Sequence, residues 1–132
     1  MTTAEFDPAG GPPVVEVRAG HAQPGSYTLL LWAAERNEVV FSARGNFINT
    51  DDDAWPLPGA VAEHDLRLVE CIATVVVTPP LDQYEVGMVV VQDGHELAAV
   101  VQSGERPPVG AVTVDLFVRL EARRVPAAGG AP

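Results

Sequence analysis

Apolar and polar residues alternate with a period of two along much of this chain. In residues 111–121, one face carries Val112, Val114, Leu116, Val118 and Leu120. The opposite face carries Thr113, Asp115, Arg119 and Glu121, together with Phe117. This period places alternate side chains on opposite sides of an extended backbone and does not occur on a helix. The pattern therefore predicts a half-buried β-strand.

Six further apolar runs end at turn residues and predict strands. They cover residues 14–19, 26–34, 38–43, 66–78, 85–92 and 96–102. Asp93-Gly94 separates the last two runs and predicts a two-residue hairpin, because both turn positions need a positive φ. Only residues 60–66 read as a short helix. About seven or eight strands with almost no helix predict an all-β fold, an antiparallel β-sandwich.

Proline and glycine are concentrated at both ends of the chain. Residues 1–13 and 125–132 lack a long apolar pattern that would bury them. We therefore predict flexible tails at both ends, with a single sandwich domain over residues 14–124.

One short motif resembles a known family. Asp65-x-Arg67-x-Val69-x-Cys71 has the spacing of the Asp-x-Ala-x-Tyr-x-Cys stretch of immunoglobulin domains, and Trp32 is similar to their core Trp. Val69 stands where that family has Tyr, and Cys71 is the only cysteine, so the disulfide of those domains cannot form. The resemblance implies an immunoglobulin-like sandwich.

Several predicted strands are apolar on both faces. This holds for residues 27–34, 66–77, 86–91 and 97–101. A sandwich sheet normally keeps one face in water, and few helices are present to cover the second face. Either another protein or the chain's own loops and tails cover it. We favour association, as a homo-oligomer or as an accessory subunit, with Trp55 and Phe117 as contact residues.

An acidic loop over residues 46–55 suggests a different function. Asn49, Asp51, Asp52 and Asp53 supply hard oxygens of the kind that calcium prefers, next to an aromatic side chain. The alternative hypothesis is thus a calcium-dependent ligand-binding module. A solvated turn, in which Asp and Asn cap backbone groups, explains the same residues.

Candidate catalytic groups are few. An acid–base enzyme would have to use His64 with Glu63 or Asp65, but neighbours in sequence seldom share a face. No Gly-x-Ser-x-Gly motif is present, and Cys71 lies within an apolar strand, where a thiol is inert. We therefore predict a protein that is not an enzyme.

Charge and composition narrow the classes of partner. The 132 residues include 18 acids and 8 bases, all of them Arg, for a net charge of -10. This balance argues against nucleic-acid binding, which depends on basic residues. No apolar run approaches the roughly 20 residues that span a bilayer. The first residues do not resemble a secretory signal, so we expect a cytoplasmic protein.

Overall fold

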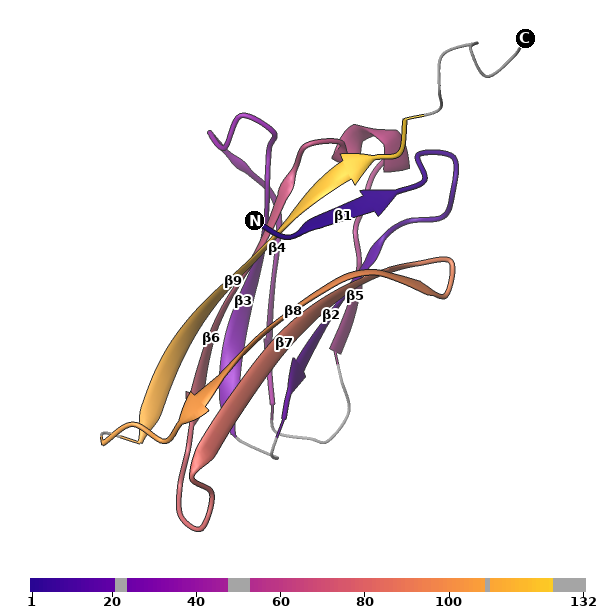
Figure 1. Ribbon diagram of the computed structural model, residues 1–132. Helices are drawn as coiled ribbons and strands as arrows, with labels where there is room; N and C mark the ends of the chain where they lie inside the picture. Colours follow the sequence, from indigo (N-terminus) through magenta and orange to yellow (C-terminus); the bar gives the residue numbers. More distant parts are fainter. Residues whose placement is uncertain (21–23, 48–52, 109, 125–132) are drawn as a thin grey trace, which may run out of the picture.

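The computed structural model describes residues 1–20, 24–47, 53–108 and 110–124 (Figure 1). This part of the chain forms nine strands and one short 3-10 turn. The strands are β1 (Thr3–Phe6), β2 (Val14–Ala19), β3 (Gly25–Trp32), β4 (Val39–Asn46), β5 (Asp53–Pro56), β6 (Leu68–Val76), β7 (Gln83–Gln92), β8 (His95–Glu105) and β9 (Ala111–Ala122), and the turn is η1 (Val61–His64).

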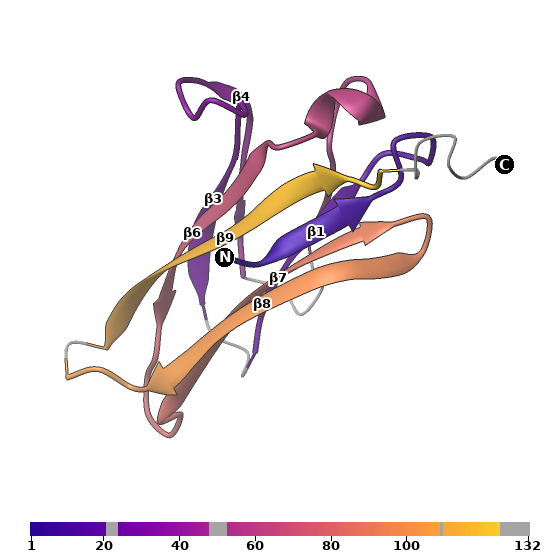
Figure 2. The same cartoon turned by 45° about the horizontal axis from the view of Figure 1, so that its top comes forward.

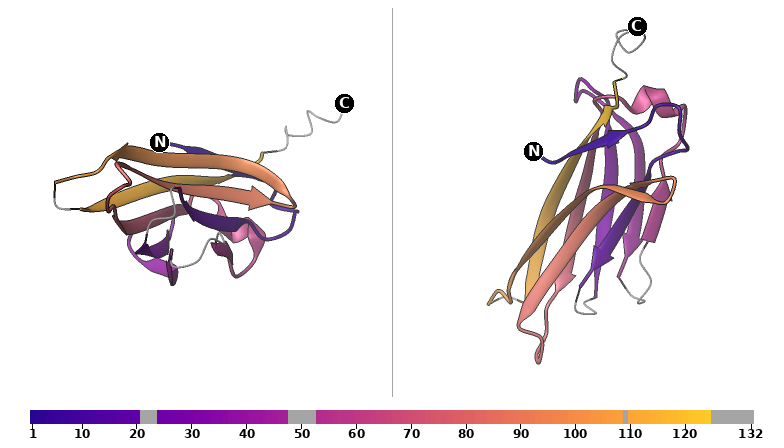
Figure 3. Two further views of the ribbon diagram at one scale, coloured as in Figure 1. Left: turned by 90° about the horizontal axis from the view of Figure 1, so that it is seen from below. Right: turned by 45° about the vertical axis from the view of Figure 1, so that its right-hand side comes forward.

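The strands form two sheets that pack face to face (Figure 3). The five-stranded sheet has the order β1-β9-β6-β3-β4, and the four-stranded sheet has the order β5-β2-β7-β8. All neighbouring pairs are antiparallel except β1 and β9. This confirms the predicted antiparallel β-sandwich, while the immunoglobulin-like subtype stays a prediction.

The core lies between the sheets and follows the alternation of the sequence. In β9, every second side chain from Val114 to Leu120 is buried, as the pattern predicts. Val69, Cys71, Ala73 and Val75 of β6 and Val86, Met88 and Val90 of β7 complete much of this core. Burial of these side chains is the main source of stability of such a fold.

The predicted turns are confirmed by their backbone conformations. Asp93 and Gly94 have φ values of 50° and 80° and join β7 to β8. Arg36, with φ of 62°, lies in the connection between β3 and β4. A positive φ at both hairpin positions matches the right-handed twist of the two flanking strands.

The prediction of a flexible tail over residues 1–13 is wrong. Thr3–Phe6 forms β1, which runs parallel to the end of β9 (Figure 2). Ala4 and Phe6 are completely buried, because they alternate with Thr3 and Glu5 and so point into the core. The predicted tail over residues 125–132 lies outside the described residues.

Three smaller predictions also need correction. Trp55 lies in the short edge strand β5, which pairs with β2, rather than in a loop. The helical candidate at residues 60–66 is the single 3-10 turn η1. Trp32 is not a core residue, because it alternates with the buried Leu31 and faces away from the second sheet.

Candidate interaction surface

The outer face of the five-stranded sheet is the most distinctive surface of the described molecule. The outward side chains of β3, β6 and β9 gather apolar and aromatic groups at its centre. We call this surface the Phe117 face and define it by Leu30, Trp32, Leu68, Glu70, Ile72, Asp115 and Phe117. Ile72 and Phe117 are each 36% exposed, and the two side chains of β3 are half-buried. Such a grouping is unusual on the free surface of a sandwich.

The strand register places these side chains in rows across the sheet. Leu30, Glu70 and Phe117 are direct neighbours on β3, β6 and β9. The next row contains Ile72, with Asp115 beside it on β9. Opposite residues on one face of an antiparallel pair lie about 5 Å apart at Cβ, so these groups form one continuous surface.

Two carboxyl groups lie within this apolar surface. Glu70 is 9% exposed, and its Oε1 accepts a hydrogen bond of 2.9 Å from Nε1 of Trp32. Loss of solvation, followed by the hydrogen bond and charge of Glu70, raises the pKa of Asp115 to about 6. The negative charge of Asp115 is therefore unfavourable beside Glu70, and a nearby cation would stabilise it.

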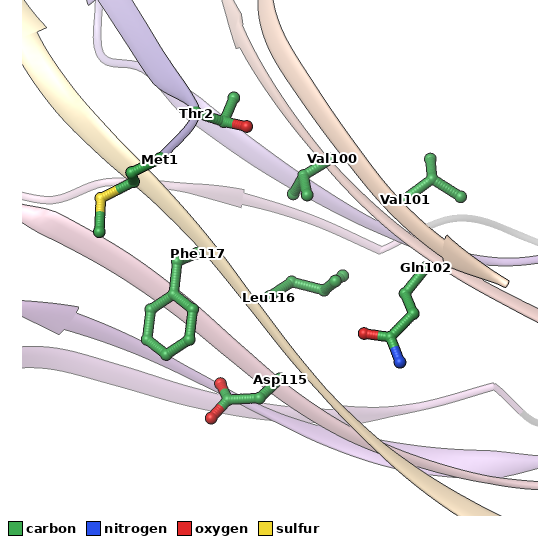
Figure 4. Close-up of a pocket in the computed structure, with 8 residues that line it drawn as sticks. All are labelled: Met1, Thr2, Val100, Val101, Gln102, Asp115, Leu116 and Phe117. Carbon is green, nitrogen blue, oxygen red and sulfur yellow. The ribbon is translucent and has the colours of Figure 1, made fainter.

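Shallow hollows accompany the Phe117 face. One, of about 240 Å3, is lined by Trp32, Arg36, Leu68, Glu70 and Phe117. A second, of about 400 Å3, lies where β9 approaches β8 (Figure 4). In that view Asp115 and Phe117 lie on one side of β9, and Leu116 lies on the other. Side chains of a partner can enter such open hollows.

Trp55, the other predicted contact residue, belongs to a different part of the molecule. Its Nε1 donates a hydrogen bond of 2.7 Å to the hydroxyl of Tyr27, which in turn donates one of 2.5 Å to Oδ2 of Asp53. Its ring is half-buried and packs against the core. The structure thus does not bring Trp55 and Phe117 together, since Trp55 faces inward and closes the gap between the sheets.

The predicted calcium ligands fall largely outside the described residues. Only Asp53 of the four is described, and its carboxylate accepts the hydroxyl of Tyr27. Among the described residues, no group of three or more His, Cys, Asp or Glu side chains is arranged to hold a metal ion. The calcium hypothesis therefore stays a prediction, carried by Asn49, Asp51 and Asp52 of the sequence.

The histidine of the acid–base hypothesis lies in η1 and is completely buried. Nη1 of Arg67 lies 3.2 Å from its Nδ1. Burial, and then the charge of Arg67, lower the pKa of His64. The Asp65 carboxylate does not bind His64. It accepts hydrogen bonds from the backbone N–H of Ala122 and from the guanidinium of Arg124 instead. Asp65 and His64 therefore do not form an acid–base pair.

Cys71 is a core residue, as the sequence predicts. The thiol is completely buried between the sheets. Burial is the main cause that raises the pKa of Cys71 to about 12, so the thiol stays protonated and unreactive.

The outer face of the four-stranded sheet is less continuous. Val89 is outward in β7, yet the chain itself leaves it only 4% exposed. Val101 of β8 is 57% exposed, and Arg18 and Glu16 of β2 form an ion pair on the same sheet. The expectation that surplus apolar side chains need outside cover therefore fails for Val89 and for Leu68, which is only 7% exposed, and within the Phe117 face it applies to Ile72 and Phe117.

Comparison of the chain with known proteins finds no relative. Neither protein-family models, nor curated proteins, nor solved structures match the chain. No helix in the described ranges has the length and apolar character needed to cross a membrane.

Proposed function

We propose that this protein is not an enzyme and acts by association, with the Phe117 face as its contact surface. The observation that carries the proposal is the cluster of partly exposed apolar side chains, Leu30, Ile72 and Phe117, in two adjacent rows of three hydrogen-bonded strands. Contiguous exposed apolar surface of this kind is typical of interaction sites. Aromatic residues at its centre are the side chains that most often dominate binding energy.

The charge of the wider outer face of the five-stranded sheet, in which the Phe117 face lies, also favours association. The outward positions of β3, β4, β6 and β9 carry Arg44, Arg119, Glu70, Asp115 and Glu121, a net charge of -1, whereas the whole chain carries -10. Interface centres are depleted of charge because burial of an unpaired charge is costly. The acidic remainder of the surface then keeps the protein soluble.

Replacing Ile72 by glutamate should abolish association through this face. An added carboxylate would have to be buried beside the Asp115 carboxylate, which should raise the dissociation constant about 100-fold. The experiment measures the native mass of the tagged full chain by size-exclusion chromatography with light scattering, for the wild type and for Ile72→Glu. It is done in extracts of the source cells and again after purification at micromolar concentration. The wild type should exceed the mass of one chain in at least one of these conditions.

Ala99→Glu is the matched control, because Ala99 is an exposed apolar residue on the outer face of the other sheet and lines neither of the two hollows. It should leave the native mass unchanged. Circular dichroism melting verifies that both variants fold. A wild type that elutes as a single chain in both conditions contradicts the proposal, and so does equal behaviour of the two variants.

A further inference from the structure

One row of side chains that crosses the Phe117 face and ends at Arg44 on β4 carries opposite charges at its two ends, which points to a second copy of the chain as the partner. A twofold dimer uses the same surface on both subunits, so each group must face a suitable group of the second copy. The charged groups of one row satisfy this condition. Arg44, Thr28, Ile72 and Asp115 lie side by side on β4, β3, β6 and β9.

A twofold axis parallel to the strands, between β3 and β6, exchanges the two ends of each row. It places β4 of one copy over β9 of the other and keeps every row at its own height. Arg44 then lies opposite Asp115 of the second copy, and the same contact repeats on the other side of the axis. Sheets that pack face to face usually cross at about 30°. Because Arg44 and Asp115 lie close to the twofold axis, this rotation moves them by only a few ångströms and keeps the two side chains opposite each other.

Both members of this pair lack an ion-pair partner within their own described chain. Arg44 is exposed on the edge strand, and Asp115 interacts with the Glu70 carboxylate, through a hydrogen bond and through the repulsion of like charges, rather than with a cation. A guanidinium of the second copy would relieve that repulsion and can bind a carboxylate through two parallel hydrogen bonds. Arg18, Arg119, Arg123 and Arg124, by contrast, already form ion pairs within the subunit.

The apolar groups fit the same arrangement. Trp32 and Leu68 are neighbours across β3 and β6. In the dimer, Trp32 of each subunit therefore lies opposite Leu68 of the other subunit. Leu30 of the second copy falls above Glu70, which lines the hollow together with Trp32, Leu68 and Phe117. A protruding side chain above a hollow is the shape match that stable interfaces require.

We infer that a second copy of this chain covers the Phe117 face, with Arg44 of each subunit paired to Asp115 of the other. This inference rests on the proposed function and names its partner. The twofold axis runs along the strands, and the resulting dimer is a four-layered stack of sheets with the two five-stranded sheets at its centre.

Charge reversal tests the pairing directly. Arg44→Asp alone and Asp115→Arg alone each create two like-charge contacts in a homodimer and should raise its dissociation constant about 100-fold. An equimolar mixture of the two variants should restore association, because both contacts of the mixed dimer again join opposite charges. The double variant should likewise form a homodimer. Sedimentation equilibrium of the purified proteins from 1 to about 100 μM, with one variant labelled, measures each case.

Arg18→Asp is the control, since it changes the net charge equally but lies on the outer face of the four-stranded sheet. It should dimerise like the wild type, and dissociation of this variant would contradict the inference. A wild type that is monomeric when pure, yet large in extracts, would overturn the dimer and leave the proposed function intact. A wild-type dimer that tolerates both single reversals would overturn the Arg44–Asp115 arrangement.

Discussion

Replacing Phe6 by alanine should lower the free energy of unfolding by about 3–5 kcal/mol, the usual cost of removing a completely buried aromatic ring. The ring lies in β1, whose backbone continues the five-stranded sheet beyond β9. The carbonyl of Phe6 also accepts a hydrogen bond of 2.7 Å from the N–H of Arg123, so the first and last described strands hold each other in place. Urea unfolding followed by circular dichroism measures the change.

Glu5→Ala is the matched control, because Glu5 neighbours Phe6 in the same strand but points into solvent. Its carboxylate lies 3.8 Å from Nε of Arg123, and both side chains are exposed, so the pair should contribute under about 0.5 kcal/mol. If Phe6→Ala were no more destabilising than Glu5→Ala, β1 would not belong to the folded domain.

The failure to predict β1 from sequence has a physical explanation. Thr3, Ala4, Glu5 and Phe6 do alternate, but four residues are too short a pattern to outweigh the prolines and glycines that follow. The strand forms because β9 is long enough to offer a free edge for it. Long edges of this kind result from tertiary pairing, which no local window of sequence contains. The same reasoning applies to β5, which is also only four residues long and pairs with β2.

Strand type was predictable where the sequence is strictly periodic or carries a defined turn. The alternation in β9 and the Asp93-Gly94 turn fix their local structure with no help from the rest of the fold. Strand order was not predictable. β6 pairs with β9 although the β7–β8 hairpin separates them in sequence and belongs to the other sheet. Only the burial of both inner faces together selects that arrangement.

The candidate surface was predictable in part. The alternation of β9 already placed Phe117 among polar residues on the outer face, and the two-sided apolar strands predicted a surface in need of cover. The role of Glu70 was missed because its neighbours Trp32 and Phe117 lie 38 residues before it and 47 residues after it in the chain. A carboxylate within an apolar strand was the available signal. Its meaning depends on register, which the sequence alone does not provide.

Replacing Tyr27 by phenylalanine should destabilise the protein by about 1–3 kcal/mol, although no carbon atom is lost. The hydroxyl is the acceptor for Nε1 of Trp55 and the donor to Oδ2 of Asp53, so its removal leaves two partly buried polar groups without this partner. Gly45 lies directly against this pair, because a Cβ at that position would approach Oδ2 of Asp53 to 2.6 Å. Burial and the Asp53 carboxylate also hold the pKa of Tyr27 well above its ordinary value.

Tyr84→Phe provides the control, because Tyr84 is a half-buried tyrosine of β7 whose hydroxyl forms no hydrogen bond to a described residue. This substitution should change the free energy of unfolding by less than about 0.5 kcal/mol. A double-mutant cycle of Tyr27→Phe with Trp55→Phe then isolates the hydrogen bond between the two side chains. We expect a coupling of about 0.5–1.5 kcal/mol. Additive effects would show that Trp55 closes the sandwich through apolar contact alone. A coupling would show instead that this polar chain, which joins β3 to β5, helps to set the spacing of the two sheets beneath the Phe117 face.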